Sequence, residues 1–100
     1  MAEVILRNDY IDILKIQKPI LHKLYGVTRL GVYGSVAREE NDADSDIDIV
    51  IEMVKPDLFN MVHIKQHLEE VLGCVVDLIH YREKMNPYLK ARIDSEIIDV

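Results

Sequence analysis

The stretch of residues 31–53 reads GVYGSVAREENDADSDIDIVIEM. Its second half alternates between apolar and other side chains, which is typical of a β-strand over residues 46–53. Three isoleucines would lie on one face of this strand, with Asp46 and Asp48 on the other. Like charges on one face repel each other, and Asp is unfavourable in strands. A bound cation is the simplest explanation for such a pair.

The composition indicates one globular domain over residues 1–100, with 49% hydrophobic and 30% charged residues. No apolar run approaches the length of a membrane-spanning helix, and the N-terminal residues lack the pattern of a secretory signal. Cys74 is the single cysteine, so it cannot form an internal disulfide. Together these features favour a cytoplasmic protein without a membrane partner.

The net charge of −6 restricts the kinds of partner. A protein that binds nucleic acid through its phosphates needs clustered Lys and Arg, so direct nucleic-acid binding is not expected. The charge is compatible with a basic protein partner. It is also compatible with a nucleotide, provided that a metal ion supplies the positive charge.

The N-terminal half predicts a helix over residues 3–25, which ends at Gly26. Pro19 either kinks this helix or opens a second short one. A short strand follows in RLGVYG, and SVARE predicts a helical turn with Ser35 as a possible N-cap. The acidic segment ENDADS, with Asp42 and Asp44, predicts a loop.

The C-terminal half predicts a second long helix from Pro56–Asp57 to Gly73, a strand in VVDLIHY, and a last helix after Asn86. The final IIDV could add a short edge strand. The apolar stripe expected to face the core from the second long helix comprises Leu58, Met61, Val62, Leu68, Val71 and Leu72.

The resulting order is α-β-α-β-α-β-α, which predicts an α/β (α+β) fold with helices packed on a small mixed sheet of three strands. The short link between the first two strands suits an antiparallel pair. The helical link to the third strand suits a right-handed parallel crossover.

Three features suggest a site. Gly34 and Ser35 lie where a strand gives way to a helical turn, which offers free backbone N–H groups to a phosphate, although Gly-Ser is also common in ordinary turns. Asp46 and Asp48 are about 6.7 Å apart along one strand face, where they could share a divalent cation or lie solvated on an exposed edge. Asp77 lies between apolar neighbours, which is costly unless it is paired, bound to metal, or at an exposed strand end.

Taken together, these residues spell Gly-Ser, ten residues, Asp-x-Asp, and a later strand Asp. This pattern resembles the signature of the nucleotidyltransferase superfamily that includes DNA polymerase beta. Over the whole chain the sequence is similar to the minimal nucleotidyltransferases (MNT), which have little beyond the catalytic core.

The resemblance implies a role for each matching residue. Gly34 and Ser35 would hold the β- and γ-phosphates of ATP, and Asp46 and Asp48 would ligate two Mg²⁺ ions. Asp77 would complete the site of the metal that activates the attacking hydroxyl. Arg38 could add a cation for the triphosphate, or it could be a solvated surface residue.

Several histidines are weaker candidates. His63 and His67 are four residues apart on a helix, which is a zinc-ligand spacing, but the sequence offers no evident third ligand. His80 ends the third strand near Asp77, so a role at the nucleotide site is a further candidate.

The resemblance also implies a partner, because this chain has no residues for a separate acceptor-binding domain. Minimal nucleotidyltransferases commonly pair with small helical HEPN-domain proteins, many of which are RNase toxins. The chain would then be an antitoxin that transfers AMP to a tyrosine of the toxin and forms a hetero-oligomer with it. A purely steric antitoxin and a free-standing aminoglycoside adenylyltransferase are the alternatives.

Overall fold

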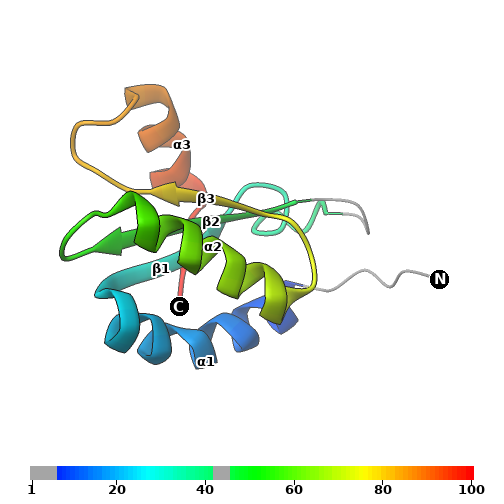
Figure 1. The fold of residues 1–100 in the computed structure, drawn as a ribbon. Coiled ribbons are helices and arrows are strands. Elements are labelled where there is room, and N and C mark those ends of the chain that lie inside the picture. The colour runs from blue at the N-terminus through cyan, green and yellow to red at the C-terminus, as the bar shows by residue number, and fades with distance from the viewer. Residues whose placement is uncertain (1–6, 42–45) are drawn as a thin grey trace.

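The computed structural model describes residues 7–41 and 46–100, in the order α1-β1-β2-α2-β3-α3-β4 (Figure 1). The predicted order α-β-α-β-α-β-α is right except at two places: residues 34–39 form turns instead of a helix between β1 and β2, and a fourth strand follows α3. The predicted helix start at Glu3 and the acidic-loop residues Asp42 and Asp44 lie outside the described residues.

The sheet is mixed, and its strands lie in the order β3-β2-β1-β4. As predicted, β1 (Val27–Tyr33) and β2 (Ile47–Met53) pair in antiparallel fashion, and β3 (Val76–His80) is parallel to β2. The predicted count of three strands is one too low, because the optional C-terminal strand forms as β4 (Ile98–Asp99) against β1.

Gly31 explains why β4 can pair with β1. A Cβ atom at this position would lie 2.8 Å from Cγ1 of Ile97, closer than such atoms approach. The bare glycine therefore admits Ile97, and the chain continues along the edge of β1. This dependence on one missing side chain is not visible in the alternation of the sequence.

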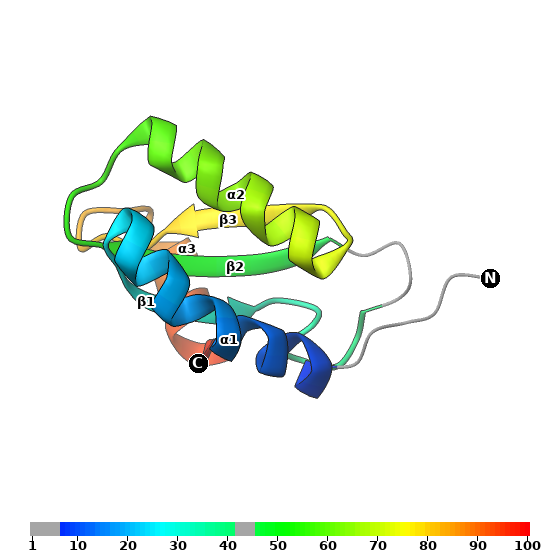
Figure 2. The ribbon, with the colours of Figure 1, turned by 60° about the horizontal axis from the view of Figure 1, so that its bottom comes forward.

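Helices cover the two faces of the sheet unequally. The helices α1 (Arg7–Tyr25) and α2 (Leu58–Leu72) lie together on one face, as both ribbon views show (Figures 1 and 2). The three isoleucines of β2 are fully buried against them, as the alternation predicted. On the opposite face, α3 (Pro87–Glu96) contributes Ile93 to a smaller cluster with Tyr33 and Val50.

The helix ends follow local chemistry. Pro19 lies inside one continuous α1, so the alternative of a second short helix is wrong. Asp57 caps α2 by accepting hydrogen bonds from two backbone N–H groups, and Gly73 ends it in the left-handed conformation. Asn86 caps α3 in the same way as Asp57, with Pro87 as the first residue, as predicted.

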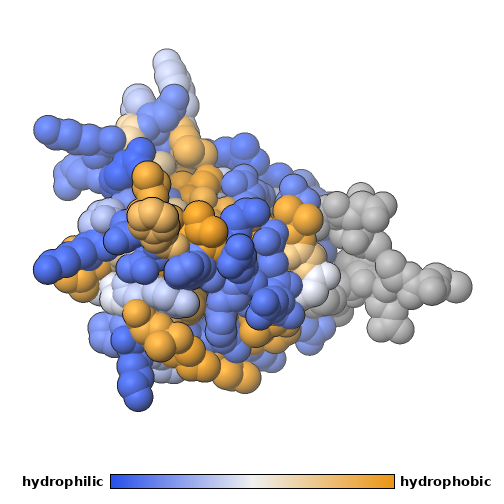
Figure 3. Space-filling view, in the orientation of Figure 1, coloured by the Kyte–Doolittle hydropathy of each residue, from blue (hydrophilic) through white to orange (hydrophobic). Residues whose placement is uncertain are grey.

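The predicted core stripe of α2 is partly wrong. Leu68 and Leu72 are buried, but the side that faces the sheet also includes Ile64, which the prediction omitted. Leu58, the first residue of α2, is 85% exposed, and Val62 is 53% exposed. Apolar side chains therefore reach the surface among polar ones (Figure 3). Within the described parts, the helices are too short or too polar to cross a membrane.

Candidate active site

The centre of the site is a pair of carboxylates on neighbouring strands. Asp48 of β2 and Asp77 of β3 are direct partners in the parallel register. On the other side of β2, Asp48 is the partner of Tyr33 in β1. The three side chains therefore form a row across the sheet, on the face that α3 partly covers, and a hydrogen bond joins Asp48 to Asp77.

The charges in this row change the acidity of its members. Burial, the charge of Asp77 and a hydrogen bond with Asp77 together raise the pKa of Asp48 from 3.8 to about 6, and the positive charge of Arg92 opposes the rise. Burial together with the two carboxylates raises the pKa of Tyr33 to about 12. Asp48 therefore holds a proton more readily than an isolated carboxylate does.

The surroundings of the two aspartates differ from the sequence-based expectation. Asp77 lies in an apolar run of sequence, yet it is exposed because β3 is the edge strand of the sheet. Asp48 lies on an inner strand and is the more buried of the two. The greater desolvation therefore falls on Asp48.

Gly34 makes room for the Asp48 carboxylate. Its φ of 75° lies in the left-handed region, and a Cβ atom here would be only 2.2 Å from Oδ2 of Asp48. That Gly34 also lets a bound phosphate approach the backbone stays a prediction. Its packing against Asp48 is an additional role, for which the sequence alone carried no signal.

Ser35 belongs to a compact turn after β1. The N–H of Arg38 donates to the carbonyl of Gly34 over 3.0 Å, and the N–H of Glu40 donates to the carbonyl of Ser35 over 2.8 Å. The predicted helical turn is therefore confirmed, but it does not continue as a helix. Any attraction for a phosphate comes from local N–H groups more than from the dipole of a long helix.

Arg38 is engaged by two carboxylates. Its Nε donates to Oε2 of Glu40 over 3.0 Å, and its Nη1 donates to Oε1 of Glu96. The other oxygen of Glu96, Oε2, accepts a hydrogen bond from Nε of Arg92 over 3.2 Å. Sequence reasoning missed Arg92 and Glu96, although their spacing of four residues on a predicted helix is that of an ion pair.

Asp46 is exposed and lies immediately before β2. Its charge contributes to the raised pKa of Asp48, after the larger effects described above. In residues 7–41 and 46–100, no three His, Cys, Asp or Glu side chains form a ready-made metal site. The carboxylate oxygens of Asp46, Asp48 and Asp77 nevertheless suit Mg²⁺, which uses one or two carboxylates together with substrate phosphates and water.

The other candidates lie elsewhere. His67 is hydrogen-bonded to Gln17 over 2.6 Å, and the ring of His63 lies 6.4 Å from that of Tyr25. Strand alternation places His80 on the opposite face of β3 from Asp77. These placements give none of the three histidines a contact with the carboxylate pair.

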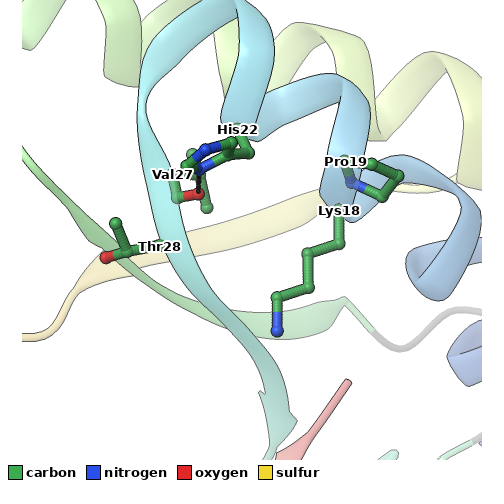
Figure 4. A pocket seen from close by; sticks show the side chains of 5 residues that line it. All are labelled: Lys18, Pro19, His22, Val27 and Thr28. Carbon is green, nitrogen blue, oxygen red and sulfur yellow. Dashed lines mark hydrogen bonds between the residues drawn. The ribbon is translucent and has the colours of Figure 1, made fainter.

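A surface hollow of about 300 Å³ lies between the C-terminal half of α1 and the start of β1 (Figure 4). Its lining is mainly apolar, and the Nζ of Lys18 donates to the carbonyl of Val100 over 2.7 Å. None of its lining residues belongs to the carboxylate row, so this hollow is separate from the candidate site.

Comparison with known families decides the identity of the fold. Residues 14–100 match the family described as "Nucleotidyltransferase domain". This chain is a nucleotidyltransferase. Gly34, Ser35, Asp46 and Asp48, which the sequence resemblance predicts to form the signature, lie within the matched segment.

Named relatives of this nucleotidyltransferase include protein adenylyltransferases. The protein adenylyltransferase MntA of Thermococcus cleftensis is 38% identical over 88 residues, which is 87% of this chain and 84% of MntA. A Methanocaldococcus jannaschii relative that carries a protein adenylyltransferase name is 39% identical over 88 residues, which is 87% of this chain and 90% of that protein.

Solved structures share the fold. A minimal nucleotidyltransferase superposes with a TM-score of 0.71 at 29% identity, covering 90% of this chain and 95% of that one. A toxin-antitoxin structure with AMP-PNP gives a TM-score of 0.69 at 20% identity, covering 95% of this chain and 72% of that one. The Shewanella oneidensis complex of a tri-AMPylated HEPN toxin with its MNT antitoxin gives 0.59 at 20% identity, covering 93% and 66%.

Proposed function

We propose that this nucleotidyltransferase moves AMP from Mg-ATP onto a tyrosine of a HEPN-type RNase toxin and thereby acts as the antitoxin of the pair. The observation that carries the proposal is the Asp48–Asp77 carboxylate pair beside the Gly34–Ser35 turn. The names of the relatives support transfer to a protein, and the complexes among the structural neighbours support the choice of partner. The antitoxin and its toxin would act in the cytoplasm as a hetero-oligomer.

In this scheme the toxin hydroxyl attacks the α-phosphorus of ATP, the new O–P bond forms, and the bond to pyrophosphate breaks. Two Mg²⁺ ions, when bound, would polarise the reacting oxygens and neutralise the charge that develops on them. Asp46, Asp48 and Asp77 would hold these ions, while Ser35 and the backbone of its turn would orient the β- and γ-phosphates.

Each carboxylate has a place in this arrangement. Asp48 is the inner ligand, fixed between Tyr33 and Asp77 by the register of the sheet. Asp77, exposed on the edge strand, and Asp46, exposed before β2, would be the outer ligands. The proton of the attacking hydroxyl would leave to water or to the departing pyrophosphate, because carboxylates that hold Mg²⁺ are not free bases.

The test is to incubate the purified chain, Mg-ATP and the HEPN-type protein encoded next to it, and to weigh the products. We expect the partner to gain the mass of one or more AMP units and to lose its RNase activity. Asp46→Asn and Asp48→Asn should abolish the gain, because each removes a negative ligand at nearly constant volume. Ser35→Ala should mainly raise KM for ATP, because the N–H groups of the turn remain.

The same experiment separates the alternative. If the partner keeps its mass and is still fully neutralised, the chain acts by steric contact. Because Asp48→Asn leaves the outer surface of the molecule almost unchanged, a steric antitoxin would keep its activity in this variant, whereas an enzyme would lose it.

A further inference from the structure

We infer that Glu96 is a positioning residue for nucleotide binding, which fixes the phosphate turn through Arg38 and holds Arg92 beside the carboxylate row. The inference rests on the proposed function, since it concerns the same nucleotide site. It assigns a task to α3, which contributes no residue to the signature.

The geometry makes Glu96 the shared anchor of two arginines. Its Oε1 accepts from Arg38 and its Oε2 accepts from Arg92, so each oxygen holds a separate guanidinium. The side chain of Glu96 is only 18% exposed, whereas that of Arg92 is 55% exposed. The two guanidinium groups in turn lower the pKa of the Glu96 carboxyl, which therefore stays ionised between them.

The two arginines come from different parts of the site. Arg38 lies in the turn that starts at Gly34, and its own backbone N–H closes that turn. Arg92 lies on α3, and its charge opposes the rise in the pKa of both Asp48 and Tyr33. Glu96 therefore joins the proposed phosphate turn to a cation that faces the carboxylates.

Packing on both sides of Glu96 fixes its position on α3. One turn before Glu96, Ile93 is fully buried with Tyr33 and Val50 on this face of the sheet. Just after it, Ile97 packs against Gly31 of β1. Because α3 is fixed at both points, the ion pair holds the turn at a set distance from the sheet.

This arrangement changes the interpretation of Arg38. If Arg38 were a direct ligand of the triphosphate, Glu96 would compete with the nucleotide, and removing the Glu96 charge would tighten ATP binding. If Glu96 positions the turn, removing its charge would loosen the turn and weaken ATP binding. The two interpretations predict opposite signs for one substitution.

The experiment measures the Kd of Mg-ATP by titration for wild type, Glu96→Gln and Glu40→Gln, together with the rate of AMP transfer. For Glu96→Gln we expect Kd and KM to rise about fivefold or more, while kcat changes less than about twofold. Glu40→Gln is the matched control, because it removes the other carboxylate on Arg38 without touching α3, and it should bind ATP as wild type does. In the double variant Arg38→Gln/Glu96→Gln, the Kd of Mg-ATP should be no larger than in the single variants, because both substitutions break the same contact.

Tighter or unchanged ATP binding by Glu96→Gln would overturn the inference. If that variant does not fold, Glu96→Asp gives the same readout, because the shorter side chain keeps the charge but withdraws the carboxylate from Arg38 and Arg92. Nucleotide affinity is measured without the partner. If the proposed protein acceptor is wrong, AMP transfer will be absent while ATP binding stays intact. If this inference is wrong, Glu96→Gln will bind ATP with an unaltered Kd.

Discussion

Gly34→Ala is the substitution for which the structure gives the sharpest expectation. The added Cβ would lie 2.2 Å from Oδ2, 3.1 Å from Cγ and 3.4 Å from Cβ of Asp48. All three atoms belong to one short side chain, which has little freedom to withdraw because Asp77 and Tyr33 flank it. We expect the Asp48 carboxylate to be displaced and AMP transfer to be lost.

The cost has two parts that can be separated. A non-glycine residue at a φ of 75° costs about 1–2 kcal/mol of stability. Displacing a packed side chain adds about 1–3 kcal/mol. Gly73 has a φ of 69°, and a Cβ there would meet no atom within 4 Å. Gly73→Ala therefore measures the backbone part alone.

Thermal unfolding and AMP transfer of the two variants test this reasoning. We expect Gly73→Ala to lower Tm by about 4–8 °C per kcal/mol of its backbone cost and to keep full activity. Gly34→Ala should lower Tm further and be inactive. Equal Tm values and equal transfer rates for the two variants would show that the Asp48 carboxylate is not held against Gly34.

Three further predictions concern the carboxylates. Because the pKa of Asp48 is raised from 3.8 to about 6, the folded metal-free protein binds protons more readily than the unfolded chain, so its stability should fall as pH rises from about 4 to above 6. Asp48→Asn should remove this fall in stability. Near pH 7.5 it should stabilise the metal-free protein by about 1 kcal/mol, after allowance for solvent screening. This gain, measured by denaturation in EDTA, should exceed that of Asp77→Asn. The increase in Tm on adding Mg-ATP should be larger near pH 8 than near pH 5.5, because the cation must displace the proton that Asp48 holds at the lower pH, and a pH-independent increase would contradict this. Asp46→Asn should leave Tm in EDTA unchanged, since Asp46 is exposed, while abolishing transfer in the mass assay.

Local patterns in the sequence accounted for most of the fold. The alternation in β2 identified the buried isoleucines, and Asp57, Gly73 and Asn86 marked helix ends through their own capping chemistry. The edges of the fold were harder to predict. Whether the last residues pair with β1 depends on the space above Gly31, which is a tertiary property.

The site was predictable as a set of residue types but not as a set of environments. The spacing of Gly34, Ser35, Asp46 and Asp48 is a linear pattern, and the family match contains it. The relative burial of Asp48 and Asp77 depends instead on which strand lies at the edge of the sheet. No local sequence pattern predicts this strand order. The tie between Arg38 and Glu96 likewise joins segments that are far apart in the chain.

The register that pairs Asp48 with Asp77 has a consequence for folding. The two residues are separated by the whole of α2, so they meet only after the long-range parallel pairing of β2 and β3 has formed. The antiparallel pairing of β1 with β2 connects segments closer in sequence and can form earlier. A partly folded chain with only this pairing would lack the site. Any opening of the sheet that includes the loss of β3 abolishes nucleotide binding. A bound nucleotide therefore disfavours all such openings, and it should slow hydrogen exchange throughout the sheet and not only near the ligand.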